Sequence, residues 1–281
     1  MNNKISIIGG DLRIVKLAKL LKEEGYQIST FGVEKSEEIL NENKTESIEE
    51  CILNVNTVIT AIPFSKDGKY VSTPFSDLKI EIKDFFLRAK NKKIILGGIN
   101  NELRSIINIE NKLEIIDIFE NEPITIMNSI PTAEGAIQIA MEQSIKTIHS
   151  SNVLILGFGR IGKILAKMIK GIGAQVYCEA RKDADIAWIQ AYDYRTIRLD
   201  DIDNYLGKFD FIFNTIPYLI LDKQKLEKLK KDCVIIDLAS YPGGIDFEEA
   251  NKLKIKTIWA LGLPRKSRTR VSCTIFEKWD S

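Results

Sequence analysis

The chain has 281 residues, of which 44% are hydrophobic, and its 40 Lys and Arg residues against 39 Asp and Glu residues leave a formal net charge of +1. This length accommodates two ordinary domains, and the near-neutral charge lacks the strong basic field typical of proteins that bind nucleic acid or a membrane surface. The four scattered cysteines show no metal-ligand spacing, and we find neither a signal peptide nor an apolar run near the ~18 residues of a membrane span, so we expect a cytoplasmic protein without a metal site.

The first half of the chain alternates short apolar strands with amphipathic helices, which predicts a doubly wound α/β domain with a parallel sheet. Predicted strands cover 4–9, 27–32, 57–64, 93–99 and 114–119, and predicted helices cover 12–24, 80–89 and 102–109. The loop 65–77 follows the carboxyl end of a strand, where open parallel sheets bind ligands. The turn Gly9–Arg13 lacks a third glycine, so it is either an anion-binding turn for a substrate carboxylate or a structural turn.

A long helix is predicted between the two halves. Pro131 suits a first helical turn and Ser129 suits the N-cap before it, ahead of the periodic run 136–148. Glu134 is then a candidate general base, or a first-turn acid that stabilises the helix N-terminus. His149, the only histidine, precedes a strand and is expected at the sheet edge away from a ligand, which disfavours a catalytic role.

Residues 151–162 join an apolar strand to a Gly-x-Gly-x-x-Gly turn, and the amphipathic run 163–169 follows. Gly157 permits the tight turn, Gly159 lets backbone N–H groups approach a pyrophosphate, and Gly162 lets the helix pack closely. The anion then lies at a helix N-terminus, which favours negative charge. With a further strand at 175–178, this context predicts a Rossmann dinucleotide site. The cofactor-binding candidates in the turn are Gly157, Phe158, Gly159, Arg160, Ile161 and Gly162.

The end of the strand at 175–178 bears on the choice of cofactor. NAD enzymes usually place Asp or Glu about 20 residues after the glycines to accept hydrogen bonds from the ribose 2′-hydroxyl. Here Ala180 is followed by Arg181 and Lys182, cations that favour the 2′-phosphate of NADP, although Arg181 could equally be a solvated surface side chain. Glu179 competes with this interpretation, but strand alternation predicts that it points to the opposite face from Ala180. We therefore expect NADP, with NAD as the alternative.

The rest of the chain predicts strands at 209–214, 233–238 and 256–260. Each is followed by a loop with Pro or Gly, and these loops lie at strand carboxyl ends, facing the nicotinamide half of a dinucleotide. Each turn alone is better explained as structural. Together they mark a cleft, and its first loop adds the cofactor-binding candidates Asn214, Thr215, Ile216 and Pro217.

Five segments in this order and spacing resemble the dipicolinate synthase A-subunit family: Ile8–Asp11, Asn128–Gly135, Gly157–Gly162, Asn214–Pro217 and Asp237–Phe247. The resemblance covers positions from about 4 to 264. It implies NADP-dependent oxidation of dihydro- or 4-hydroxytetrahydrodipicolinate to dipicolinate (pyridine-2,6-dicarboxylate) in the mother cell of a sporulating bacterium. It also implies a partner, the smaller, flavoprotein-like B subunit of dipicolinate synthase, and a homo-oligomer is compatible with it.

Forming the aromatic ring requires hydride transfer to nicotinamide, loss of a ring proton, and neutralisation of two substrate carboxylates. Neutral donors and one guanidinium can hold carboxylates without a metal. The predicted substrate-binding residues are Arg13, Asn128, Ser129 and Thr132, and the predicted catalytic residues are Glu134 and Ser240. Ser129 serves equally well as a helix cap.

We predict an N-terminal α/β domain at 1–126, an interdomain helix at 127–150, a Rossmann NADP-binding domain at 151–264 and an atypical basic tail at 265–281. Family members usually continue Gly-Lys-Val-Ala-Pro after Pro264, where this chain reads Arg-Lys-Ser-Arg-Thr. One nucleotide stretch can encode both in different frames, so we hypothesise a frameshift near Pro264. A divergent, solvated basic tail is the alternative.

Two other functions stay open. The chain could be a non-catalytic NADP-binding subunit or a truncated pseudo-enzyme, which the absence of a catalytic histidine and the altered tail favour. A 2-hydroxyacid dehydrogenase is disfavoured, because those enzymes use a histidine in the later part of the cofactor domain and this chain has none there.

Overall fold

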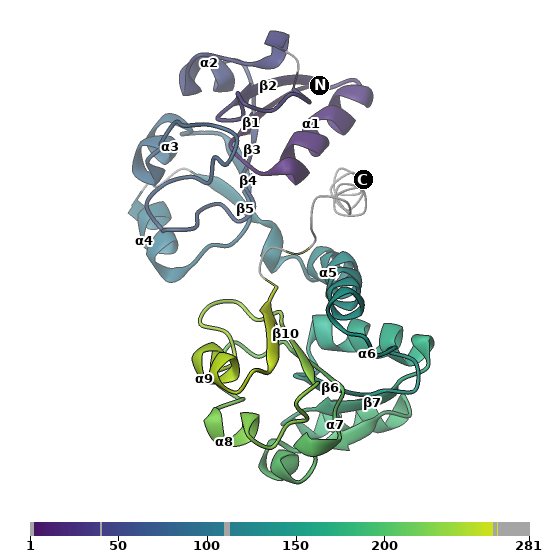
Figure 1. The fold of residues 1–281 in the computed structure, drawn as a ribbon. Helices are drawn as coiled ribbons and strands as arrows, with labels where there is room; N and C mark the ends of the chain where they lie inside the picture. Colours follow the sequence, from purple (N-terminus) through teal and green to yellow (C-terminus); the bar gives the residue numbers. More distant parts are fainter. Residues whose placement is uncertain (1–2, 40, 110–112, 261–262, 264–281) are drawn as a thin grey trace. The chain divides into compact units, whose positions relative to one another are not determined.

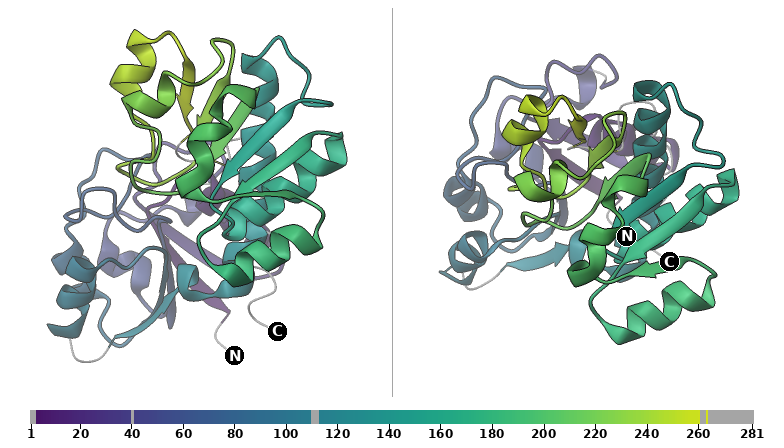
Figure 2. Two further views of the ribbon diagram at one scale, coloured as in Figure 1. Left: turned by 90° about the horizontal axis from the view of Figure 1, so that it is seen from below. Right: turned by 60° about the horizontal axis from the view of Figure 1, so that its bottom comes forward.

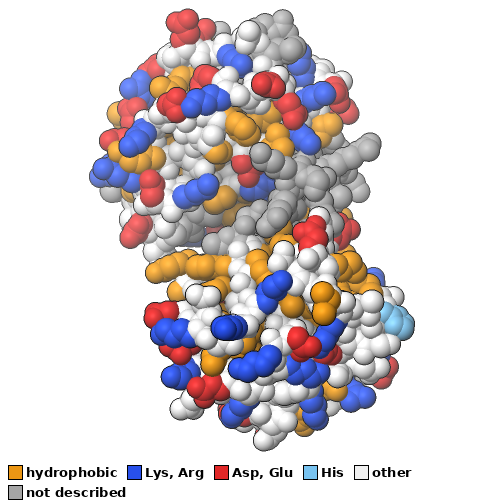
Figure 3. All heavy atoms as spheres, in the orientation of Figure 1, with side chains coloured by type: hydrophobic (Ala, Val, Ile, Leu, Met, Phe, Trp, Pro, Cys, Tyr) orange, Lys and Arg blue, Asp and Glu red, His pale blue; other side chains and the backbone are white. Residues whose placement is uncertain are grey.

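The computed structural model describes residues 3–39, 41–109, 113–260 and 263, which divide into two compact units after Met127. Each unit contains one parallel sheet with helices on both faces (Figure 1), so the predicted fold class is confirmed. Within the described part of the chain, no helix is long and apolar enough to cross a membrane. Lys and Arg side chains are interspersed with Asp and Glu over the face seen in Figure 3, as the near-zero net charge suggests.

The N-terminal unit has a five-stranded sheet in the order β2-β1-β3-β4-β5. Its strands are β1 (Lys4–Ile8), β2 (Gln27–Phe31), β3 (Thr57–Thr60), β4 (Lys93–Leu96) and β5 (Glu114–Asp117). Its helices are α1 (Leu12–Glu23), α2 (Ile48–Ile52), α3 (Ile82–Arg88) and α4 (Asn101–Ile109), with 3-10 turns at Asn41–Asn43 and Ile118–Glu120.

Different helices cover the two faces of this sheet. One face packs on α1, whose buried side chains include Ile14 and Leu17, and the other packs on α2, α3 and α4 (Figures 1 and 2). On the second face the rings of Phe64, Phe85 and Phe86 form a fully buried cluster with centroids 5.2–5.6 Å apart. Aromatic pairs at such distances stabilise a core beyond their buried area alone.

The C-terminal unit has a six-stranded sheet in the order β11-β10-β9-β6-β7-β8. Its strands are β6 (Asn152–Leu156), β7 (Gln175–Glu179), β8 (Arg195–Ile197), β9 (Phe211–Asn214), β10 (Val234–Asp237) and β11 (Lys256–Trp259). This unit also contains most of α5 (Glu122–Gln143). Its other helices are α6 (Arg160–Ile172), α7 (Asp183–Ala191), α8 (Lys223–Leu226) and α9 (Phe247–Lys252), and it has 3-10 turns at Leu199–Asn204 and Leu206–Lys208.

The strand order of this sheet fixes where a ligand can bind. The chain runs outward from β6 through β7 to β8 and then returns to β9 on the other side of β6, so the order reverses between β6 and β9. Open α/β sheets bind dinucleotides at such a switch point, outside the strand carboxyl ends. The central strands are buried throughout, as parallel strands covered on both faces must be. α5 and α6 cover one face, and α8 and α9 cover the other (Figure 1).

The helix predicted to begin near Pro131 in fact begins at Glu122 and ends at Gln143. Asn121 starts it, because its side-chain oxygen accepts a hydrogen bond from the N–H of Ile124 at 3.1 Å, and Pro123 occupies the first turn. Pro131 therefore lies inside α5 and cannot donate to the carbonyl of Met127. The prediction took Pro131 as the first-turn proline of this helix, whereas Pro123 is the proline in the first turn.

Candidate dinucleotide site

The three glycines of the turn after β6 play three different physical roles. Gly157 has φ +89°, in the left-handed region, and a Cβ there would lie 2.6 Å from Thr215 Oγ1. A Cβ on Gly162 would collide with the carbonyl oxygen of Gly157, so this glycine allows α6 to pack on the turn. A Cβ on Gly159 would meet none of the described residues within 4 Å. The position that must approach a pyrophosphate is therefore the one that opens into free space.

Helix α6 presents its N-terminus at this turn. Gly159 is the N-cap residue and has no side chain to cap the helix, whereas Gly173 ends it in the left-handed conformation with φ +97°. The first N–H groups of a helix need partners from outside it, and a phosphate supplies them together with the charge that the helix dipole favours. The N-terminal end of α6 is thus suited to binding an anion.

Glu179, the last residue of β7, reaches the glycine turn. It pairs in register with Leu156, and its Oε2 accepts a hydrogen bond from the N–H of Gly157 at 3.2 Å. The side chain is buried, and Oε1 has no hydrogen-bond partner among the residues that the structure describes. Burial raises the pKa of Glu179 above its usual range, against the opposing effects of the Gly157 N–H and of Arg181.

Successive side chains of β7 point to opposite faces of the sheet, as predicted. Cys178 and Ala180 belong to the core on the α6 side, and Tyr177 belongs to the opposite core, so Glu179 lies on the other face from Ala180. What sequence reasoning missed is that this face still brings the carboxylate to the glycine turn. The signal was available, because Glu179 follows Gly157 by 22 positions, close to the spacing of a ribose-binding acid.

Arg181 and Lys182 follow β7 and are both exposed. The guanidinium carbon of Arg181 lies 5.7 Å from the ring centroid of Tyr218, in the loop after β9, so a cation–π contact holds it beside the switch point. Lys182 takes the N-cap position of α7 without a capping hydrogen bond from its side chain. The residues present therefore fit a nicotinamide dinucleotide, with one carboxylate at the end of the second strand of this sheet, β7, and two cations after it.

A buried carboxylate organises the loops on the other side of the switch point. Asp237, at the end of β10, is fully buried and accepts three hydrogen bonds, from Asn214 Nδ2 at 2.8 Å, Ala239 N at 3.0 Å and Gly244 N at 2.8 Å. Asn214 in turn bonds the carbonyl oxygen and the N–H of Ile216 at 3.0 and 3.1 Å. The loops after β9 and β10 are thus joined through one carboxylate, which sequence reasoning did not single out.

Thr215 joins the same loops to the glycine turn. Its N–H and its hydroxyl both donate to the carbonyl of Leu156 at 2.9 Å. The predicted cofactor residues Asn214, Thr215 and Ile216 therefore lie around the first glycine, and Pro217 is exposed beyond them. The structure brings these candidates together with Gly157–Gly162.

The predicted substrate residue Arg13 lies in the N-terminal unit, in the first turn of α1. Its guanidinium donates to the Asp11 carboxylate at 2.9–3.1 Å and to the carbonyl oxygen of Ile62 at 2.5 Å. Asp11 also caps α1 through the N–H of Arg13 at 3.0 Å. A substrate carboxylate would have to compete with Asp11 for this cation.

The other substrate-side candidates lie in the C-terminal unit. Asn128, Ser129, Thr132 and Glu134 are all interior residues of α5, so Ser129 is not its N-cap and Glu134 is not a first-turn acid. Ser129 and Thr132 are buried, and the Thr132 hydroxyl donates to the carbonyl of Asn128 at 3.0 Å. Ser240 is exposed in the loop after β10. No observation assigns a ligand to any of these five residues, and their roles stay predictions.

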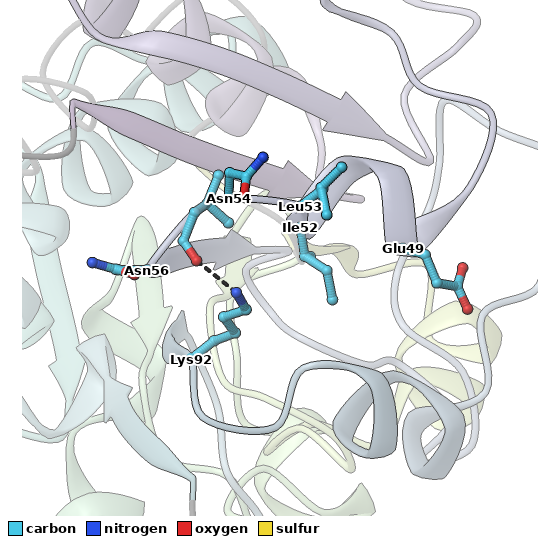
Figure 4. A pocket seen from close by; sticks show the side chains of 7 residues that line it. Glu49, Ile52, Leu53, Asn54, Asn56 and Lys92 are labelled. Atoms are coloured by element: carbon cyan, nitrogen blue, oxygen red, sulfur yellow. Dashed lines mark hydrogen bonds between the residues drawn. The ribbon is translucent and has the colours of Figure 1, made fainter.

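Two features lie away from the strand carboxyl ends. A hollow of about 630 Å³ in the N-terminal unit adjoins the starts of β3 and β4, and Lys92 Nζ donates across it to the carbonyl of Val55 at 2.7 Å (Figure 4). His149 precedes β6 and bonds Ser150 through Nδ1 at 2.9 Å, at the amino edge of its sheet as predicted. Parallel sheets bind ligands at the opposite edge.

Comparison with known proteins agrees with this description. Residues 4–119 match the N-terminal domain of the dipicolinate synthase A subunit, and residues 129–241 match the NAD binding domain of D-isomer specific 2-hydroxyacid dehydrogenase. The dipicolinate synthase A subunit of Bacillus subtilis (strain 168) is 33% identical over 263 residues, which cover 93% of this chain and 89% of that protein.

Two solved structures have the same fold over nearly the whole chain. The A subunit of dipicolinate synthase from Bacillus subtilis superposes with a TM-score of 0.85 at 30% identity, covering 99% of this chain and 94% of the other. The A subunit of dipicolinate synthase from Bacillus halodurans superposes with a TM-score of 0.85 at 28% identity, covering 98% of this chain and 95% of the other.

Two doubly wound units, the second with a dehydrogenase-type NAD(P)-binding domain, define an oxidoreductase that uses a nicotinamide cofactor. The identity and coverage then assign the family. This chain belongs to the dipicolinate synthase A-subunit family.

The predicted basic tail, 265–281, and the frameshift hypothesis concern residues outside those that the structure describes.

Proposed function

We propose that the chain is an NADP-dependent oxidoreductase that forms dipicolinate from dihydro- or 4-hydroxytetrahydrodipicolinate during sporulation, in the cytoplasm of the mother cell. It acts as the A subunit of dipicolinate synthase, and the B subunit is its partner. The observation that carries this proposal is the complete glycine turn, with open space at Gly159, in a chain that matches a dipicolinate synthase A subunit over 93% of its length.

The cofactor, when bound, would accept a hydride from the dihydropyridine ring, and a ring proton would leave as the ring becomes aromatic. A 4-hydroxytetrahydrodipicolinate substrate would first lose its 4-hydroxyl group and a neighbouring ring hydrogen as water. The chain's own contribution is to bind and to orient. The Asp237 carboxylate fixes the two loops that face the nicotinamide half, and the exposed Ser240 on the second loop offers a hydroxyl donor to a substrate carboxylate. Glu134 is the proposed acceptor of the ring proton.

Arg181 is the proposed partner of the 2′-phosphate. We expect Arg181→Ala to weaken NADPH binding by roughly 1.5 to 3 kcal/mol, the range for a hydrogen bond to a charged group, and to leave NADH binding nearly unchanged. Adding Ala180→Asp should move the preference toward NADH, because a carboxylate accepts ribose hydroxyls and repels phosphate. Fluorescence titration of both nucleotides measures this.

Arg198→Ala is the matched control for this change, since Arg198 is an exposed cation near the same sheet edge that pairs with Asp183 at 2.8 Å. The Arg198→Ala variant should bind both NADPH and NADH with the affinity of the wild type. Equal losses for NADH and NADPH in Arg181→Ala would show that Arg181 only supports the loop through Tyr218, and the NADP assignment would then depend on Lys182.

The proposed reaction is tested by mixing the purified protein, with and without its B partner, with NADP and freshly generated 4-hydroxytetrahydrodipicolinate. We expect the absorbance of the pyridine ring and of NADPH to rise together. A protein that binds NADPH yet forms no product in either mixture would support the alternative of a non-catalytic role. Product formation by the B partner in the absence of this chain would contradict the proposal.

A further inference from the structure

We propose that the ring of Tyr241 is a platform on which the six-membered ring of the substrate stacks, and that this contact favours a flat, aromatic ring over a puckered, partly saturated one. Tyr241 then determines specificity for the shape of the ring, whereas donors such as Ser240 hold its carboxylates. This inference deepens the proposed function and rests on it.

Three aromatic side chains are stacked at the carboxyl edge of the C-terminal sheet. The indole of Trp259, the last residue of β11, is stacked against Tyr241 in the loop after β10 and against Phe247, the first residue of α9. The ring centroids are 6.3 and 5.3 Å apart, and both interplanar angles are 24°. Trp259 Nε1 also donates to the carbonyl oxygen of Ala239 at 3.0 Å, so the support of the Tyr241 ring is fixed.

The backbone around Tyr241 is held as firmly. The N–H of Gly243 donates to the carbonyl of Ser240 at 2.8 Å, which closes a tight turn, and the Asp237 carboxylate holds the N–H of Gly244 at 2.8 Å. Tyr241 is nevertheless 83% exposed, more than any other aromatic residue that the structure describes. A ring left in solvent adds little burial to the fold, so this fixed ring is available to a ligand.

The sheet order places Tyr241 on the substrate side of the site. The loop after β9 borders the glycine turn, because the Thr215 hydroxyl donates to the carbonyl of Leu156 at 2.9 Å. The loop after β10 follows one strand farther out, about 4.8 Å away, and Trp259 belongs to the edge strand beyond it. A dinucleotide bound at the switch point therefore meets the first loop, and the second loop meets what lies beyond the nicotinamide.

The ring of the proposed substrate changes shape during the reaction. Saturated carbons pucker a partly reduced ring, whereas the ring of dipicolinate is planar and can contact Tyr241 over its whole face. A gap of about 0.5–1 Å already forfeits a quarter to a half of the attraction between two atoms. The contact therefore strengthens as the ring flattens, and an interaction that strengthens toward the transition state accelerates the reaction.

The test compares two probes that carry the same pair of carboxylates: dipicolinate, which is planar, and piperidine-2,6-dicarboxylate, which is saturated. Each is titrated by calorimetry, in metal-free buffer, into the protein loaded with NADPH in the presence of its B partner. In Tyr241→Leu the affinity for dipicolinate should fall by about three- to tenfold, the effect of one aromatic pair, and the affinity for the saturated probe by less than about twofold. Tyr241→Phe keeps the ring and should match wild type.

Tyr192→Leu is the matched control. Tyr192 is also an exposed tyrosine stacked on a tryptophan, Trp188, with centroids 5.4 Å apart, but it caps the end of α7 before β8 begins, away from the strand carboxyl ends. This variant should bind both probes as wild type does. Circular dichroism of each variant checks the fold.

Steady-state kinetics with 4-hydroxytetrahydrodipicolinate gives a second readout. Tyr241→Leu should lower kcat by about the same factor as the affinity for dipicolinate and leave KM nearly unchanged, because the puckered ring makes the weaker contact. A rise in KM without a change in kcat would show that Tyr241 binds both rings equally, which overturns the selection for a flat ring.

The outcomes separate this inference from the proposed function. Equal changes for the two probes in Tyr241→Leu, or none for either, overturn the stacking role and leave the proposed function standing. Weaker NADPH binding with an unchanged ratio of the two probe affinities also overturns it, because the ring then serves the nicotinamide. Failure of wild type to bind dipicolinate at all overturns the proposed function as well.

Discussion

Replacing Gly159 by Val is expected to weaken NADPH binding by about two orders of magnitude or more, while the fold remains. The new methyl groups fill the free space that the pyrophosphate needs, and none of the described residues lies within 4 Å of a Cβ at this position. Gly159 has an extended backbone at the N-cap, which Val can adopt, so stability should fall by only about 1 kcal/mol. Fluorescence titration and urea unfolding measure the two effects.

Gly162→Ala is the contrasting variant. Its Cβ would collide with the carbonyl of Gly157, so it should lose stability as well as binding. Wild-type NADPH affinity in Gly159→Val would show that the turn is only structural and that the dinucleotide, if any, binds elsewhere.

Replacing Asp237 by Ala is expected to lower the free energy of unfolding by about 3 kcal/mol or more. The change leaves buried donors on Asn214, Ala239 and Gly244 without an acceptor, and each such group costs about 1–3 kcal/mol. Because these donors hold the loops after β9 and β10, cofactor affinity should fall too. Urea denaturation with and without NADPH tests both expectations.

Asp201→Ala serves as the control for this variant, since Asp201 is exposed in the 3-10 turn Leu199–Asn204 and its replacement should change stability by less than about 0.5 kcal/mol. Asp237→Asn should fall between the two, because it keeps one acceptor oxygen but turns an N–H toward a donor. A loss in Asp237→Ala no larger than in the control would mean that water replaces the carboxylate and that the loops do not depend on it.

The fold was predictable because the strong signals are local. Apolar runs bounded by glycines mark the buried strands, and the strand and the helix expected on either side of the Gly157–Gly162 turn are both present. The start of α5 was missed because two prolines, Pro123 and Pro131, each fit a first turn. The side chain of Asn121, which caps the helix before the first proline, decides between them.

The hydrogen-bond partners of the two buried carboxylates, Glu179 and Asp237, could not be predicted in the same way. Glu179 and Asp237 each end a strand, and the sequence shows an acid there without showing what donates to it. Their donors come from turns that neighbouring strands bring near, at Gly157 and Asn214 respectively. Whether a buried acid is satisfied or keeps an unpartnered oxygen depends on sheet order and register, which only the folded chain defines.

The central claim is that a hydride passes from the substrate ring to a nicotinamide held by this chain. It is tested most directly with 4-hydroxytetrahydrodipicolinate that carries deuterium on its saturated ring carbons, incubated with NADP, this protein and its B partner. We predict that deuterium appears in the nicotinamide ring of the NADPH formed, and that Gly159→Val abolishes the transfer. Dipicolinate formed with no deuterium in the nicotinamide, or formed equally well by Gly159→Val, would contradict the account.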